Sequence, residues 1–230
     1  MARGRTSTVV KSRFVRPGSS RTTPAAYRGR PGGGARRQIG AALRYIQARM
    51  LGPQERPEDR ALFDARQDDV IRREAREELA RWVTPSVAYH SLVLSPGPPG
   101  EGMSMAQMRE WTRQVMADLE TRWGGTLAWY AVVHQHTGHI HAHVIVAASR
   151  ESPGGGRQGT YFGREDFAAM RTSGDHRAEQ ELASLHLWRE AERYAAGLAQ
   201  LTLALPRGGG DGGRGPTDRD EIERSLRSHR

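Results

Sequence analysis

The segment from Thr126 to Ala147 constrains the fold more than any other part of the chain, because it contains two apolar runs of β type around a short polar turn. The runs read TLAWYAVVH and HIHAHVIVA, and the four residues QHTG join them. Apolar, β-branched and aromatic runs separated by a few residues that include glycine predict a β-hairpin. Strands joined by so few residues must be antiparallel, so the fold must contain an antiparallel sheet.

Helical patterns surround this hairpin. Segments with apolar positions at helical spacing, or with charges around sparse apolar points, are 35–50, 57–82, 103–123, 164–170 and 175–199. Two more β-type runs, 7–15 and 86–96, precede the hairpin. Ser104 is expected to cap the third helical segment. This order of elements predicts an α+β fold, in which helices pack on a central and mostly antiparallel sheet.

Composition divides the chain into three expected regions. Residues 1–36 are expected to form a basic N-terminal strand and a mobile loop rich in Arg, Gly and Pro, residues 37–205 the core, and residues 206–230 a flexible, Gly-rich, charged tail. No apolar run approaches the roughly 20 residues of a membrane span, and the N-terminus lacks the apolar centre of a secretory signal. We therefore expect a cytoplasmic protein that does not insert into a membrane.

Histidine is concentrated in the hairpin, since five of the nine histidines lie between His134 and His143. Side chains alternate faces along a strand, so His139, His141 and His143 share one face at spacings of about 6.6–7 Å. Two such imidazoles can bind one metal ion through bonds of roughly 2 Å, whereas three in a row span roughly 13 Å. We predict a metal site made of His134 and two of the other three. The alternative is a strand of surface or buried neutral histidines without a metal.

Charge is also unevenly distributed. The chain has a formal net charge of +9, and residues 1–54 contain twelve basic residues and no acidic one. A segment of one sign indicates a polyanion binder, with a solvated basic tail as the alternative. No basic amphipathic helix with a broad apolar face occurs there, which favours nucleic acid over a membrane surface. A cation held by histidines in a polyanion binder points to phosphodiester chemistry.

The motif VVHQHTGHIHAHVIV, preceded by one helix and by YHSLVLSPGPPGE, resembles the HUH-type conjugative relaxases, the plasmid mobilisation nucleases of the MobA and VirD type. This resemblance implies an HUH endonuclease-like sheet that carries the metal site. It implies that the metal ligands are His134, His141 and His143. It also implies that His90 and Glu101, from the preceding strand segment, support these ligands.

The segment ALRYIQARM looks like the nucleophile motif of the same family, which maps the nucleophile to Tyr45. The implied reaction is an attack of Tyr45 on a phosphodiester of single-stranded DNA at a plasmid transfer origin. It leaves a covalent 5′-phosphotyrosine and a free 3′-hydroxyl, so the strand can be rejoined. The implied cofactor is a divalent ion, Mg or Mn first, with Zn, Ni or Co as alternatives. The implied partners are single-stranded DNA, relaxosome accessory proteins and a type IV secretion coupling protein.

The basic N-terminal region is expected to contact DNA phosphates. The arginines expected to do so are Arg13, Arg16, Arg28, Arg30, Arg36, Arg37, Arg44 and Arg49.

One position departs from the family pattern. Many members carry Asp two residues after the first ligand, whereas this chain carries His136, which with His139 is a candidate for catalytic proton transfer. An imidazole cannot replace the charge of a carboxylate, so reduced activity is one outcome. Tyr27 is the alternative nucleophile. A rolling-circle replication initiator with the same site, an inactive DNA-binding accessory protein and a His-rich metal carrier are the alternative functions.

Overall fold

The computed structural model describes residues 8–17, 33–48, 60–100, 102–135, 139–152 and 154–204. The chain divides into two compact units, residues 1–186 and 187–230. All strands among the described residues belong to the first unit. None of the described helices combines the length and the apolar composition that crossing a bilayer requires.

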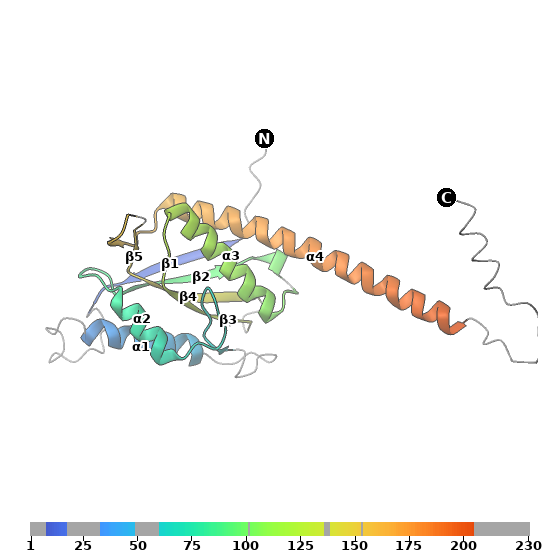
Figure 1. The fold of residues 1–230 in the computed structure, drawn as a ribbon, viewed down its shortest axis with the longest axis horizontal. Coiled ribbons are helices and arrows are strands. Elements are labelled where there is room, and N and C mark those ends of the chain that lie inside the picture. Colours follow the sequence, from blue (N-terminus) through green and yellow to red (C-terminus); the bar gives the residue numbers. More distant parts are fainter. Residues whose placement is uncertain are drawn as a thin grey trace, which may run out of the picture. The chain divides into compact units, whose positions relative to one another are not determined.

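Four strands form the main sheet, in the spatial order β1 (Val9–Val15), β2 (Tyr89–Ser95), β4 (His141–Ala147) and β3 (Trp129–His134) (Figure 1). Every neighbouring pair is antiparallel. In the hairpin of β3 and β4, His134 is the register partner of His141. The predictions of an α+β fold and of this hairpin are therefore confirmed.

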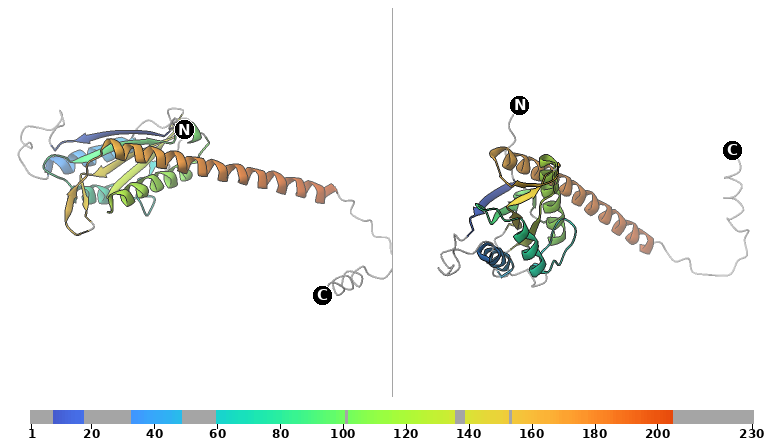
Figure 2. Two further views of the ribbon diagram at one scale, coloured as in Figure 1. Left: turned by 90° about the horizontal axis from the view of Figure 1, so that it is seen from above. Right: turned by 60° about the vertical axis from the view of Figure 1, so that its left-hand side comes forward.

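Helices cover both faces of the sheet (Figures 1 and 2). Their bounds are Gly33–Ala48 for α1, Arg72–Arg81 for α2, Met105–Trp123 for α3 and Arg164–Ala204 for α4. Helices α1 and α2 contribute Ile39, Leu43 and Leu79 to a core with Ile145 and Ala147 of β4. On the other face, α3 and the first part of α4 pack on β2, β3 and β4 in a second core. Alternation along each strand thus supplies two apolar layers from one sheet.

Helix α3 begins and ends as its sequence predicts. The Ser104 hydroxyl accepts a hydrogen bond from the backbone N–H of Gln107, and the Gln107 side chain accepts one from the backbone N–H of Ser104. This capping box satisfies two N–H groups that the first turn leaves without helical partners. At the other end, Gly124 adopts the left-handed conformation with φ 61°, which glycine adopts at little steric cost.

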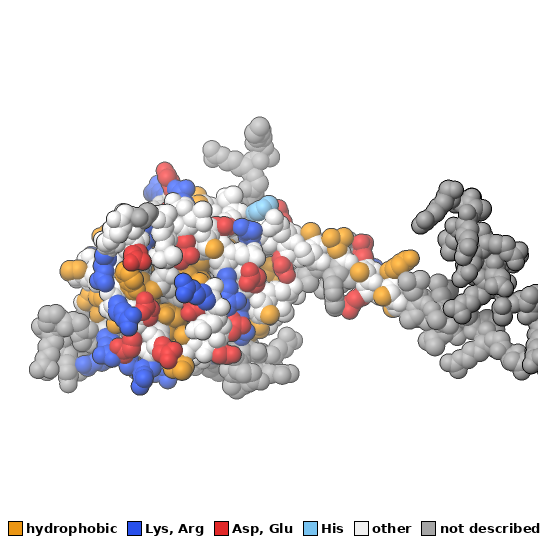
Figure 3. Space-filling view, in the orientation of Figure 1, with side chains coloured by type: hydrophobic (Ala, Val, Ile, Leu, Met, Phe, Trp, Pro, Cys, Tyr) orange, Lys and Arg blue, Asp and Glu red, His pale blue; other side chains and the backbone are white. Residues whose placement is uncertain are grey.

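The prediction of a helix over 57–82 is wrong for the described residues before Arg72, where α2 begins. Before it, Leu62 and Phe63 form isolated β-bridges with Val70 and Ala131. These bridges use backbone groups that a helix would need. Both apolar side chains are buried, so tertiary packing overrides the helical charge pattern. On the face drawn in Figure 3, acidic and basic side chains are interspersed over the surface.

Two further expectations need correction. The segments 164–170 and 175–199 belong to one continuous helix, α4, which passes through Gly174. The Gly174 carbonyl accepts a hydrogen bond from the Trp111 indole at 3.0 Å, and a Cβ at Gly174 would lie only 2.6 Å from a Thr8 methyl carbon. Glycine here serves close packing rather than a helix break. The glycine content of segment 152–159 predicts a loop, but the segment contains part of a small hairpin of β5 (Ser149–Glu151) and β6 (Arg157–Gly159).

Candidate metal centre

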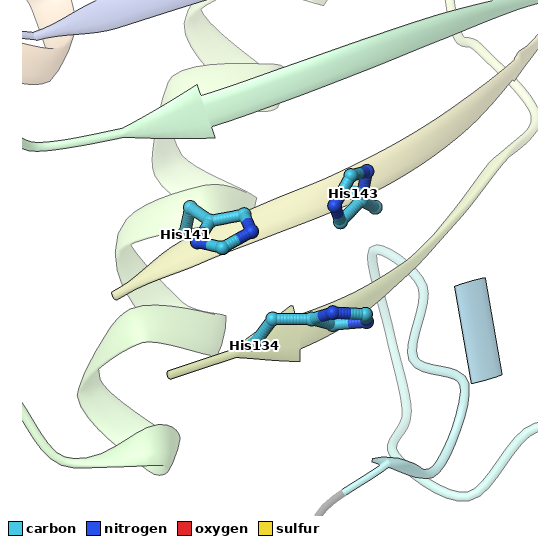
Figure 4. Close-up of side chains that lie close together, drawn as sticks. All are labelled: His134, His141 and His143. Carbon is cyan, nitrogen blue, oxygen red and sulfur yellow. The ribbon is translucent and has the colours of Figure 1, made fainter. Parts of the chain in front are cut away.

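Three imidazoles from two adjacent strands converge on one face of the sheet: His134 at the end of β3, and His141 and His143 at the start of β4 (Figure 4). One ring nitrogen from each lies within 4.8 Å of those of the other two. His134 is fully buried and the other two are nearly so. Within the part of the chain that the structure describes, this is the one such cluster of potential metal ligands.

Two of the three rings are oriented by main-chain carbonyls. The Nε2–H of His134 donates a hydrogen bond to the carbonyl of Ile46 at 2.6 Å, and the Nδ1–H of His141 donates one to the carbonyl of His139 at 2.9 Å. A neutral imidazole carries one proton, so these bonds leave the lone pair on Nδ1 of His134 and on Nε2 of His141. Carbonyl partners that fix the tautomer in this way are typical of metal-binding histidines. The donor set therefore fits a divalent transition metal.

Helix α1 ends beside this centre. Ile46 lies in its last turn, where backbone carbonyls have no helical partner and the helix dipole places partial negative charge. Such an end favours a cation. The side of the hairpin opposite the histidines, with Ala142 and Val144, lies against α3 and α4, but the histidine side is covered by helices as well. Ile145 and Ala147 share the histidine face, and α1 and α2 cover them because apolar side chains must be buried.

The remaining hairpin histidines do not join the cluster. Strand β4 begins at His141, so His139 lies outside the strand with an exposed side chain. The expectation that His139, His141 and His143 share one face of a strand is wrong for His139. His136 lies outside the described residues, as does Glu101. His90 pairs with Val146, whose side chain belongs to the opposite core. It therefore lies on the other face and cannot support the ligands, since strand alternation separates it from His143.

Tyr45 precedes Ile46 on α1, and its side chain is 61% exposed. The apolar positions Ile39, Leu43 and Ile46 point into the core, so Tyr45 lies on the solvent side of a helix whose last turn contacts His134. The alternative nucleophile, Tyr27, lies outside the described residues.

Two other tyrosines of this face are buried. Tyr130 lies on β3 four residues before His134, so the two side chains are on the same face of the sheet. Burial, together with Glu78, Asp64 and Glu74, raises the pKa of Tyr130 to about 12. Burial also raises the pKa of Tyr89. Both phenols are poor sources of a phenolate near neutral pH.

The arginines expected to contact DNA divide into three groups. Arg28, Arg30 and Arg49 lie outside the described residues. Arg36 forms an ion pair with Glu77, and its hydrogen bond is the largest cause that lowers the pKa of that carboxyl group. The remaining four have exposed side chains. Arg13 lies on β1 and Arg16 directly after it, whereas Arg37 and Arg44 lie on α1.

The structure adds one cation that the sequence did not single out. Lys11 pairs across the sheet with Val93, which pairs with His143, so these side chains share a face. Lys11 is two strand spacings from His143, or roughly 9.5 Å. Arg13 follows on the same face of β1. The sequence contains no signal for this proximity, because pairing of β1 with β2 and its register arise only in the folded sheet.

The sequence matches no protein-family model and no curated protein. The fold is similar to solved relaxase domains. A MobM relaxase domain, solved with manganese and plasmid oriT DNA, aligns at 12% identity and a TM-score of 0.46, over 76% of this chain and 86% of that chain. The relaxase TrwC, solved with metal and oriT DNA, aligns at 13% identity and a TM-score of 0.42, over 76% of this chain and 68% of that chain. Likeness at this level assigns no role to any residue.

Proposed function

We propose that the chain is a metal-dependent nuclease that nicks and rejoins single-stranded DNA at a plasmid transfer origin, with Tyr45 as the nucleophile. The observation that carries this proposal is the convergence of three imidazoles, two of them oriented by main-chain carbonyls, beside the last turn of α1, the helix that bears Tyr45. Relaxosome accessory proteins and a type IV secretion coupling protein would be its partners.

The ligands would be His134 through Nδ1, His141 through Nε2, and His143. When bound, a divalent ion such as Mn or Mg would polarise a non-bridging phosphate oxygen and neutralise charge that develops on the phosphate. The hydrogen bonds to the carbonyls of Ile46 and His139 hold the two rings ready for it. Little reorganisation is then needed on binding.

Tyr45 would perform the bond exchange. Its phenol oxygen attacks phosphorus, so an Oη–P bond forms while the bond from phosphorus to the 3′ oxygen breaks. The phenol proton passes to an imidazole, for which His139 and His136 are the candidates, and then to the departing 3′ oxygen. Attack by the 3′-hydroxyl reverses these steps and rejoins the strand, with no further co-reactant.

Basic side chains would hold the DNA on the histidine face. Lys11 and Arg13 form a cationic row on β1, the edge strand, beside the surface that leads to His143. Arg37 and Arg44 are exposed on α1. Cations on two sides of the centre suit a polyanion that passes over it, because each neutralised phosphate releases counterions and adds to affinity.

The test is covalent capture. The full chain is incubated with Mn²⁺ or Mg²⁺ and a labelled single-stranded oligonucleotide from its own origin region. A protein–DNA adduct should form with the wild type and be lost in Tyr45→Phe. Tyr194→Phe, at another exposed tyrosine on α4, is the matched control and should retain the adduct.

Each other result has a defined meaning. An adduct that survives Tyr45→Phe would move the nucleophile elsewhere, with Tyr27 as the next candidate. DNA binding without an adduct under either metal would contradict catalysis and favour the accessory protein.

A further inference from the structure

A second basic surface lies on the opposite side of the sheet. A groove of about 700 Å³ runs between β1 and the beginning of α4, a size within the roughly 300–1,000 Å³ of small-ligand sites. Four arginines and four aromatic side chains contribute to its walls, and no acidic residue is among the described residues that line it. The metal centre uses none of these aromatic side chains.

Aromatic rings form two sides of the groove. Phe14 on β1 is 53% exposed and Tyr161 is 73% exposed. Large apolar rings exposed to this extent contribute little to the core and form a ready stacking surface. Behind them, Phe162 and Phe167 stack on each other at 5.8 Å with planes 15° apart. The Arg16 guanidinium lies 5.8 Å from the centre of the Phe14 ring, so cationic and aromatic groups are interleaved.

Two of the four positive charges come from one stripe of α4. Arg164, Phe167 and Arg171 are three and four residues apart, so they share a face of the helix, and all three line the groove. The acidic residues of the first turn do not oppose them there, because Glu165 and Asp166 form ion pairs with Arg122 of α3. The groove is therefore complementary to anions.

His90 supplies a buried polar group at the groove. Its side chain is 5% exposed, is hydrogen-bonded to the main chain of Thr160, and meets the edge of Phe162 with ring centres 5.1 Å apart. Its Nε2 makes no hydrogen bond among the described residues. Buried polar atoms usually have a partner, so this acceptor would suit an N–H or O–H of a ligand.

We propose that this groove binds nucleotides of single-stranded DNA at a site separate from the metal centre. Arg164 and Arg171 would contact phosphates, Phe14 and Tyr161 would stack on bases, and His90 would accept a hydrogen bond from a base or sugar. Interleaved cations and aromatic rings are the combination that single-strand binding uses. An acidic peptide would use only the charge. The inference rests on the proposed function, because it concerns the same polynucleotide.

The test measures binding of a fluorescent single-stranded oligonucleotide to the full chain in EDTA, as a function of salt. The double variant Arg164→Gln/Arg171→Gln should lower the slope of log K against log salt by about 1.4, since each phosphate contact contributes about 0.7. Tyr161→Ala should weaken binding by a factor of roughly 5 to 150 and leave the slope unchanged, because stacking involves no counterion. The control is Arg66→Gln/Arg73→Gln, which removes the same charge at exposed positions outside the groove. It should leave the slope of log K against log salt at the wild-type value.

Equal effects of the two arginine pairs would overturn the proposal, as would wild-type affinity in Tyr161→Ala. The metal-dependent adduct is followed in the same variants at saturating DNA. If no protein forms an adduct but the groove variants lose binding as expected, the groove assignment stands and the nicking function fails. If all form the adduct and bind normally, only the groove assignment fails.

Discussion

The Nε2–H of His134 on β3 donates a hydrogen bond to the main-chain carbonyl of Ile46 on α1, at 2.6 Å. The two residues are 88 positions apart in sequence. This single bond ties the orientation of an imidazole in the candidate metal centre to the position of the helix that bears Tyr45. Disturbing α1 should therefore affect metal binding as well as stability.

Metal binding should depend on the ligands and not on the neighbouring histidine. We expect His141→Ala to abolish stoichiometric Mn²⁺ binding in isothermal titration calorimetry, because two imidazoles leave the ion with too few protein ligands. His139→Ala is the control and should bind Mn²⁺ with the wild-type stoichiometry, since its side chain lies outside β4 and is exposed. Full binding by His141→Ala would exclude the proposed ligand set.

Loosening α1 should weaken the metal site. Leu43→Ala should lower the free energy of unfolding by about 2–5 kcal/mol, because this side chain of α1 is fully buried in the core between α1 and the sheet. It should also weaken Mn²⁺ binding roughly tenfold, as loss of an orienting partner does in other metal sites. Urea unfolding and calorimetry give the two quantities.

Met116→Ala is the matched control for this coupling. Met116 is fully buried in the other core, on α3, and its truncation should cost a similar free energy of unfolding of about 2–5 kcal/mol. Its Mn²⁺ affinity should stay at the wild-type level. Equal losses of affinity in both variants would show that general destabilisation, and not α1, weakens the site.

His90 should make stability depend on pH. Burial lowers the pKa of His90 below its ordinary value of 6.5, against a hydrogen bond with Thr160 that raises it. The unfolded chain therefore takes up this proton at a higher pH than the folded one. The contribution of neutral His90 to the free energy of unfolding is fully present above pH 6.5. It is lost as the pH falls towards the pKa of His90 in the folded state.

We expect His90→Phe to remove this pH dependence. The difference in free energy of unfolding between variant and wild type should grow in favour of the variant below pH 6.5, by at most about 1.4 kcal/mol per pH unit. Urea unfolding at about pH 7.5 and about pH 5.5 measures it across the window in which a histidine titrates. Parallel curves for the two proteins would show that His90 takes up its proton equally in the folded state.

Gly174 should resist a substitution that helices normally favour. Alanine is the better helix former by about 1 kcal/mol, yet a Cβ at Gly174 would lie 2.6 Å from Thr8 and 3.0 Å from Trp111. We expect Gly174→Ala to destabilise by about 1–3 kcal/mol through overpacking. Gly34→Ala in α1, where a Cβ would meet nothing within 4 Å, should be neutral or stabilising. Thermal unfolding of both variants measures the two effects, and equal stability of the two variants would contradict the close packing at Gly174.

The sequence predicted those parts of the molecule that local patterns determine. The hairpin of β3 and β4 follows from alternation and turn length, and the start of α3 follows from Ser104 and Gln107. Leu62 and Phe63 were misassigned because their bridges depend on Val70 and Ala131 rather than on local spacing.

The same distinction applies to the candidate site. Spacing along one hairpin led to the group that contains His134, His141 and His143. It could not reveal that Ile46 contacts His134 or that Lys11 shares the face of His143, because both relations arise between segments far apart in sequence. His90 was placed on the wrong face for the same reason.

Side chains of β1 alternate between two functional surfaces, and this limits insertions and deletions in the strand. Its odd position Lys11 faces the histidine side, and its even positions Val10, Ser12 and Phe14 line the groove behind the sheet. Inserting or deleting one residue within β1 would exchange the two sets of side chains. An outermost strand is often where a fold accepts length variation, but here an insertion or deletion in β1 would disturb both surfaces at once.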